Sequence, residues 1–300
     1  MVKTYLNNGL RIGILFFTFF FACKVTFGQS YVFKILALKG HALVKVNSTW
    51  LALKSGEALK AGEEIKVNAN SYIALVHTSG RPLEIKVEGI YKVDDLNTNF
   101  KQEASILSKY FNFILTSNSE REKKNKLSAV GGVRRDLYDI NLLLPSRANM
   151  VLKDALLIEW ETATLEPYVI EFRNMYGDLL DKAVVNEHLI EINFEDPKFK
   201  NEPRINMIVS CSSCKTSNRI ISRLPEKEQI RLKEQVAKLQ HELGQRTSVT
   251  ELAMASFYEQ NELFADAADS YLRAIKLSPD ILSYQEYFHE YLVRNKLKDP

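Results

Sequence analysis

The sequence has few of the residues from which catalytic and metal sites are built. Of its 300 residues, 3 are cysteine, 5 are histidine and 12 are glycine. No two histidines have the spacing of a His-Glu-x-x-His metal motif, and no glycine-rich loop has the spacing of a phosphate-binding loop. A Gly-x-Ser-x-Gly elbow, which would position a nucleophilic serine, is also missing. These absences predict a protein that is not an enzyme and uses no metal ion or other cofactor.

Long apolar runs are also missing. The longest, Ile12–Ala22, is interrupted only by a glycine and a threonine and is much shorter than the span of about 20 residues that a membrane helix needs. Lys3 and Arg11 precede it, and such a positive start before a short apolar core is typical of a secretory signal peptide. We therefore predict a protein that is exported to the periplasm, secreted or associated with the outer membrane.

Small residues near position 28 predict where the signal peptide ends. Thr26 and Gly28 occupy the two positions that a signal peptidase reads, so we expect residues 1–28 to be removed and Gln29 to become the first residue. Two alternatives remain open: an uncleaved membrane anchor, and a lipid attached to Cys23. The motif for lipid attachment usually has leucine three residues before the cysteine, and this chain lacks a leucine at that position.

An excess of charge of one sign is missing from the mature chain. The formal net charge of +3 equals the charge of Lys3, Arg11 and Lys24, and residues 1–28 contain no acidic residue. Removal of this segment leaves a formally neutral protein, which argues against a nucleic-acid partner. Association with a membrane or a cell wall stays open. The hydrophobic fraction of 46% and the charged fraction of 26% indicate a folded chain.

Export also removes Cys23 and leaves one cysteine pair, Cys211-Ser-Ser-Cys214. We predict that Cys211 and Cys214 form a short structural disulfide at the end of a hairpin or strand. A thioredoxin-like redox pair would need its first cysteine at a helix N-terminus, whereas an alternating strand over residues 205–209 precedes this one. Zinc would need two more ligands, and the nearest histidine in the sequence is His188.

Residues 30–97 have the pattern of a small all-β domain. Apolar residues alternate with their neighbours, as at Phe33, Ile35 and Ala37, which predicts strands with one buried face. Turn-forming glycines recur at short intervals, which favours a sandwich or barrel of many short strands.

Spaced glycines and leucines in this region resemble the FecR-like domain of bacterial envelope proteins. The residues that carry the resemblance are Gly40, Ala42, Val44, Trp50, Leu53, Gly56, Leu59, Gly62, Glu63, Ile65, Val67, Ala74, Leu75 and Gly80. Ser79 departs from the family, which usually has an acidic residue there. The resemblance implies a periplasmic β-module without catalytic activity. It does not imply an anti-sigma regulator, because too few residues precede the apolar run to form a cytoplasmic segment.

The pattern changes at residue 100. Ala104, Leu107 and Phe111 begin an apolar stripe with helical spacing, which predicts a packing helix over residues 100–116 that covers the β-module. Residues 117–144 begin with a polar and charged stretch, and we expect a linker there.

Residues 145–224 return to strands. Leu156, Ile158 and Trp160 alternate in one of them, and the next contains Tyr168, Ile170 and Phe172, followed by a turn at Tyr176-Gly177-Asp178. This pattern resembles an immunoglobulin-like or fibronectin type III sandwich.

Residues 226–300 are predicted to be helical. Pro225 suits a first helical position and Gly244 a helix end, and Ser248 with Glu251 has the form of a capping box. From Ser248 onward the chain resembles a tetratricopeptide repeat, whose period is 34 residues. Its core positions fall on Ala255, Tyr258, Ala267, Tyr271, Ala274 and Pro279. A single repeat buries too little surface to be stable, so we expect the neighbouring helices to complete the stack.

Together these patterns predict a multidomain α+β protein with two small all-β modules followed by an α-helical, tetratricopeptide-like hairpin region. The expected function is that of a bacterial cell-envelope scaffold or adaptor that binds an envelope protein partner through the helical region. The alternative is a module that binds peptidoglycan or another polysaccharide through the first β-domain, where Trp50, Tyr72 and Tyr91 could stack on sugars.

Overall fold

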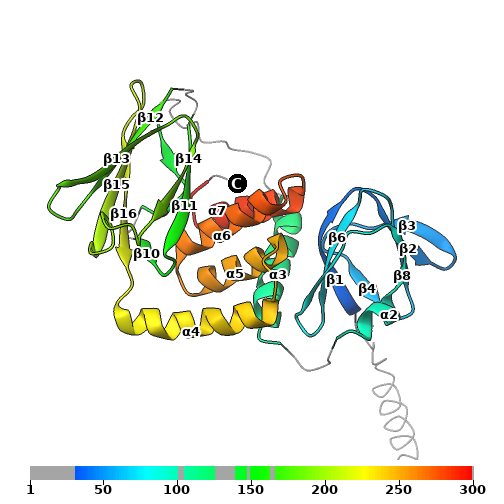
Figure 1. Cartoon of the computed structure of the whole chain (residues 1–300). Coiled ribbons are helices and arrows are strands. Elements are labelled where there is room, and N and C mark those ends of the chain that lie inside the picture. The colour runs from blue at the N-terminus through cyan, green and yellow to red at the C-terminus, as the bar shows by residue number, and fades with distance from the viewer. Residues whose placement is uncertain (1–30, 101–104, 126–138, 147–148, 163–165, 299–300) are drawn as a thin grey trace, which may run out of the picture. The chain divides into compact units, whose positions relative to one another are not determined.

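The computed structural model describes residues 31–100, 105–125, 139–146, 149–162 and 166–298 (Figure 1). The predicted signal peptide, with its cleavage position at Gly28 and Gln29, lies outside the described residues. The fold is mixed α+β, with two β-modules followed by four helices, as predicted. Within the described ranges, no helix combines the length and the apolar character that crossing a membrane requires.

The first β-module is a sandwich of two four-stranded sheets. Its strands are β1 (Tyr31–Lys39), β2 (Ala42–Val46), β3 (Thr49–Ala52), β4 (Ala58–Lys60), β5 (Glu64–Val67), β6 (Tyr72–His77), β7 (Pro82–Ile85) and β8 (Gly89–Lys92). The strand orders are β4-β1-β6-β7 and β3-β2-β5-β8, with antiparallel pairing throughout. Phe33 and Ile35 of β1 and Ile65 of β5 share one buried core, which confirms the predicted all-β module.

Strand β6 is buried along its whole length. Ile73 and Leu75 belong to the core between the two sheets. Tyr72, Ala74 and Val76 alternate with them and join a second core that also contains residues of the helices. The first sheet is therefore covered on both faces, and β6 lacks the alternation that marks a half-exposed strand.

The predicted packing helix begins later than expected and has additional partners. Helix α2 (Val93–Asn97) closes the first module, and α3 (Ser108–Asn125) extends into the segment expected to be a linker. Tyr110 of α3 contacts Phe257 ring to ring at 5.7 Å, and the Ser256 hydroxyl donates a hydrogen bond of 3.1 Å to the Tyr110 carbonyl. The helix therefore packs mainly on the C-terminal helices.

The first β-module closely approaches the start of α3. Gly80, in the turn after β6, has a φ of +90°, and a Cβ there would lie 2.3 Å from the Ser108 nitrogen. Tyr284 and Tyr287, on a helix near the C-terminus, also contact the outer face of this sheet. Leu107, Phe111 and Ile114 of the stripe belong to the same buried core as Tyr72, Ala74 and Val76 of β6. Coverage of the β-module by the stripe alone stays a prediction.

The second β-module is a sandwich of a three-stranded and a five-stranded sheet. Its strands are β9 (Asn141–Leu142), β10 (Asn149–Val151), β11 (Ala155–Glu161), β12 (Tyr168–Arg173), β13 (Leu179–Val185), β14 (Leu189–Asn193), β15 (Arg204–Ser210) and β16 (Ser217–Arg223). The strand orders are β14-β11-β9 and β10-β16-β15-β12-β13. The Trp160 and Tyr168 rings meet edge to face at 5.4 Å in the core. Strand β15 lies between β12 and β16, as strand F lies between C and G in immunoglobulin-like sandwiches; membership of that family stays a prediction.

Four helices follow: α4 (Glu226–Leu243), α5 (Ser248–Gln260), α6 (Phe264–Leu277) and α7 (Leu282–Arg294). The capping box of α5 lies one residue earlier than predicted. The Thr247 hydroxyl accepts the Thr250 N–H at 3.3 Å, and the Thr250 hydroxyl accepts the Thr247 N–H at 2.7 Å. Pro225 is the N-cap of α4 rather than its first helical residue, and Gly244 ends that helix with a φ of 71°.

Candidate functional site

The α5–α6 hairpin contains the positions predicted for the repeat core. Ala255, Ala267 and Ala274 have no exposed surface, and Tyr258 and Tyr271 are 3% and 1% exposed. Pro279 lies in the exposed turn after α6. Small residues at these positions allow close approach of the helices, so the pattern identified a helical hairpin. Its assignment to the tetratricopeptide family stays a prediction.

Helix α6 contacts the second β-module through Asp266, which has no exposed surface. Its carboxylate accepts the backbone N–H groups of Leu152 at 3.1 Å and Lys153 at 2.6 Å, in the turn between β10 and β11. Burial disfavours the charged form and raises the pKa of Asp266 to about 6, although the Lys153 N–H and ammonium oppose this rise. The carboxylate therefore supplies acceptors for two backbone N–H groups that the strand pairing leaves without a hydrogen bond.

Asp269, one turn later, is also fully buried and is the centre of an ion-pair network. It accepts the Leu157 N–H at 2.7 Å and the Arg273 Nε–H at 2.8 Å, and it pairs with the Lys153 ammonium. Arg273 continues to Glu191 of β14, at 2.7 Å. Two carboxylates on one face of α6 therefore fix this helix against the second β-module.

Helix α7 contacts the first β-module through tyrosines. The Tyr284 and Tyr72 hydroxyls lie 2.9 Å apart, and the Tyr287 hydroxyl donates a hydrogen bond of 2.7 Å to the Leu36 carbonyl of β1. Burial raises the pKa of both Tyr72 and Tyr284, which keeps them neutral. Lys39 and Asp280 add an ion pair at the surface. The C-terminal helices thus hold both β-modules through buried polar contacts.

The three aromatic residues considered for sugar stacking have different surroundings. Tyr72 is 8% exposed and is bonded to Tyr284, so it cannot stack on a sugar. Tyr91 packs against the sandwich core, and its hydroxyl donates to the Val87 carbonyl at 2.8 Å. Trp50 is partly exposed, with the Lys45 ammonium 5.9 Å from its ring centroid. An aromatic platform that includes Tyr72 is therefore excluded.

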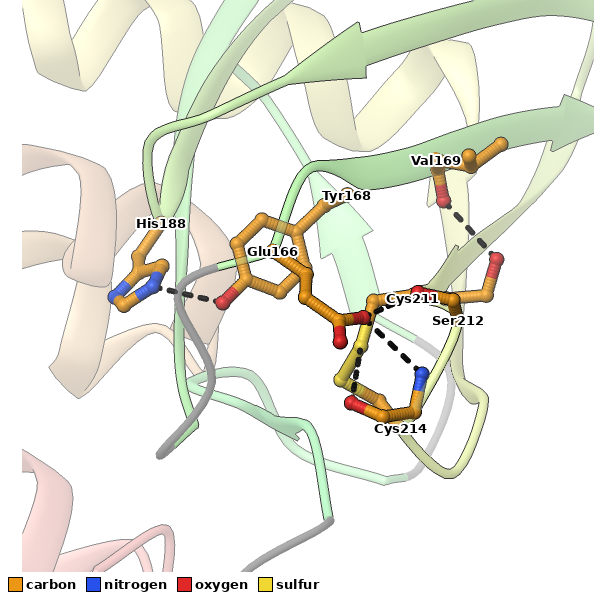
Figure 2. Close-up of a disulfide and its surroundings, with 9 residues drawn as sticks. Glu166, Tyr168, Val169, His188, Cys211, Ser212 and Cys214 are labelled. Atoms are coloured by element: carbon orange, nitrogen blue, oxygen red, sulfur yellow. Dashed lines mark hydrogen bonds between the residues drawn. A yellow bond between two sulfur atoms is a disulfide. The ribbon is translucent and has the colours of Figure 1, made fainter.

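Cys211 and Cys214 are joined by a disulfide in the loop from β15 to β16 (Figure 2). Glu166 points toward this loop and accepts hydrogen bonds from the Ser212 hydroxyl and, at 3.2 Å, from the Ser213 N–H. The bond from Ser212 lowers the pKa of Glu166. Because strands lie on both sides of the loop, no helix dipole activates Cys211 as it would in a redox pair.

His188, the histidine nearest to the cysteines in sequence, does not join them in the structure. Its Nε2 lies 2.9 Å from the Tyr168 hydroxyl (Figure 2). Among the described residues, no three His, Cys, Asp or Glu side chains gather as a metal site would require.

Loss of the disulfide is expected to lower stability modestly. Replacement of both Cys211 and Cys214 by serine should reduce the free energy of unfolding by about 2 kcal/mol, because the closed loop is short. Equilibrium urea unfolding of the double variant measures this loss, and reduced wild-type protein is the matched control. A binding activity that vanished in a folded double variant would contradict a purely structural role.

Sequence analysis did not identify Asp266 and Asp269. Charged side chains are rarely buried, so their residue type alone does not mark them as internal. Their i, i+3 spacing on the same face as Ser270 and Arg273 is a polar stripe inside an otherwise alanine-rich helix. That stripe was the available signal, but its partners come from a strand turn more than 100 residues earlier in the chain.

No protein-family model matches the chain, and no curated protein matches it. The complex of the RgpB pro- and mature domains from Porphyromonas gingivalis aligns over 29% of this chain and 19% of that chain, with 9% identity and a TM-score of 0.21. The Arg-specific cysteine proteinase gingipain R aligns over 29% and 18%, with 9% identity and a TM-score of 0.22. The β-glucuronidase of Faecalibacterium prausnitzii aligns over 66% and 35%, with 12% identity and a TM-score of 0.20. Likeness at this level transfers no activity.

Proposed function

We propose that the protein is an exported, non-catalytic scaffold of the bacterial cell envelope that binds a protein partner through its helical region. The observation that carries the proposal is the position of the α5–α7 helices. Asp266 and Asp269 on α6 bind the second β-module, and Tyr284 and Tyr287 on α7 bind the first. A helical unit anchored in this way presents its remaining surface rigidly, which lowers the entropy cost of binding.

The face formed by α5 and α7 is not free for a partner, because α3 packs there. Phe257 of α5 contacts Tyr110, and the Arg294 guanidinium of α7 lies 5.4 Å from the Phe113 ring centroid. Apolar side chains elsewhere on the helices remain exposed, with Ile230 at 56% and Leu282 at 68%. We assign partner binding to the surfaces around these two residues.

Site-specific crosslinking in intact cells tests this proposal. A photo-crosslinking amino acid is placed in the full chain at Ile230 or at Leu282, and in control variants at Tyr176 or Ile90 of the β-modules, which are 81% and 62% exposed. The expected result is one protein crosslinked from the helical positions and not from the controls. The full chain is needed because residues 226–300 alone would expose the buried faces of α6 and α7.

The polysaccharide alternative predicts a different outcome. The purified full chain would sediment with peptidoglycan, Trp50→Ala would abolish this sedimentation, and the helical positions would give no protein crosslink. That combination of results would replace a protein partner with a glycan.

A further inference from the structure

A cavity of about 640 Å³ opens where the helices meet the second β-module. Its wall combines residues from the end of α4, from α5, from α6 and from the edge of the three-stranded sheet; they include Leu243, Glu251, Met254, Tyr258, Arg273 and Glu191. The volume lies in the range of natural small-molecule sites. No sequence pattern indicates the cavity, because its residues come from three helices, two strands and the β10–β11 turn.

Tyr258 places a hydroxyl on the wall of this cavity. The residue is 3% exposed, and its hydroxyl is accessible from the cavity and makes no hydrogen bond with any described residue. The Lys153 ammonium lies 4.9 Å from the ring centroid and fixes the ring. Burial and the nearby carboxylates, Asp266 first among them, raise the pKa of Tyr258 and keep its hydroxyl protonated. The hydroxyl of a largely buried tyrosine normally has a hydrogen-bond partner, and a ligand in the cavity can supply it.

The positive and negative side chains around the cavity balance in charge, and some of their hydrogen-bonding atoms have no partner in the protein. Glu251, whose side chain is 9% exposed, pairs with Arg246 through one carboxylate oxygen. Arg273 uses its Nε on Asp269 and one terminal nitrogen on Glu191. Within the described residues, this leaves guanidinium N–H groups of Arg246 and Arg273 and one carboxylate oxygen each of Glu251 and Glu191 without a hydrogen bond.

This balance restricts the chemistry of the ligand. A phosphate or other dianion would meet three carboxylates in the lining, and a simple cation would meet three basic groups. A ligand that carries one charge of each sign satisfies both sets. Beside the polar Gln240 and Thr250, the lining contains the apolar residues Leu243, Met254 and Ala155, which suit small apolar side chains.

We propose that this cavity binds a short zwitterionic peptide. Its carboxylate faces Arg246 and Arg273, its ammonium group faces Glu251 and Glu191, and the Tyr258 hydroxyl hydrogen-bonds to its backbone. This site is separate from the exposed helical surface assigned to a protein partner, and the inference does not depend on that assignment.

Calorimetric titration of the full mature chain with trialanine tests the proposal. We expect saturable binding at millimolar or lower concentration, and a loss of at least about tenfold in affinity for N-acetyl-trialanine amide, which lacks both charges. Trialanine amide and N-acetyl-trialanine, each with one charge, should bind with intermediate affinity. Absence of saturable binding by trialanine, or equal binding of the capped peptide, overturns the proposal.

Variants then locate the binding. Tyr258→Phe should weaken trialanine binding by about five- to tenfold, because one hydrogen bond is lost. It should leave the melting temperature of the free protein unchanged, because the hydroxyl has no partner inside the protein. Tyr176→Phe, at an 81% exposed site in the β12–β13 turn, is the matched control and should bind as the wild type does. Equal affinity of the Tyr258→Phe variant and the wild type would place the peptide elsewhere and refute the assignment.

Discussion

Replacement of Asp269 by alanine is expected to lower the free energy of unfolding by about 3–5 kcal/mol. The carboxylate has no exposed surface and binds the Leu157 N–H, the Lys153 ammonium and the Arg273 guanidinium. Its loss leaves a buried amide without an acceptor and two cations without their shared anion. Equilibrium unfolding of the full chain in urea measures the change.

Two further variants keep this prediction decisive. Asp269→Asn retains an acceptor for the Leu157 N–H and should lose less stability than Asp269→Ala. Comparison of Asp269→Asn with the wild type measures the contribution of the charge, even if Asp269→Ala does not fold. Asp280→Ala removes a carboxylate whose side chain is 64% exposed and that pairs with Lys39 at the surface, so stability should hardly change. Equal losses of unfolding free energy for Asp280→Ala and Asp269→Ala would show that the buried network does not stabilise the fold.

Stability is also expected to fall by about 3 kcal/mol as the pH rises from about 3 to about 7, through Asp266 alone. Burial raises the pKa of this carboxyl from 3.8 to about 6 in the folded protein. Between these values the unfolded chain has lost the proton and the folded chain still holds it. The unfolded state thus binds fewer protons, and the free energy of unfolding decreases with pH until Asp266 ionises in both states.

The Asp266→Asn variant isolates this effect from other titrating groups. The carboxylates of Glu171, which is partly exposed, and of Glu195, which is exposed, have lowered pKa values through hydrogen bonds from Arg173 and Arg223. They change stability in the opposite direction. These groups are unchanged in the variant, so subtraction of its pH profile from that of the wild type leaves the Asp266 contribution. Parallel profiles would mean that Asp266 has an ordinary pKa in the folded state.

Local patterns predicted most of the architecture because they depend on neighbouring residues. Alternation at Phe33 and Ile35 indicated a sandwich strand, and small residues at Ala255 and Ala267 indicated a close helical hairpin, and the structure has both. The helix at residues 100–116 was also recognised from its stripe, although it begins later, at Ser108.

The partners of these elements could not be predicted in the same way. An apolar stripe specifies that a face is buried but not everything that covers it, so the contacts of α3 with α5 were not foreseen. The carboxylates of Asp266 and Asp269 have the composition of a solvated surface, and only the tertiary contact with the β10–β11 turn makes them internal. The cavity around Tyr258 likewise exists only after three helices and two strands have come together.

The burial of β6 on both faces bears on the order in which the molecule can be completed. Tyr72, Ala74 and Val76 form an apolar surface that the first β-module cannot cover by itself. Helix α7, which covers this face through Tyr284 and Tyr287, leaves the ribosome about 200 residues after β6. During synthesis, and during any translocation in an unfolded state, the first β-module therefore exposes an apolar surface until α7 packs on it. A chaperone that covers this surface in the interval would prevent aggregation.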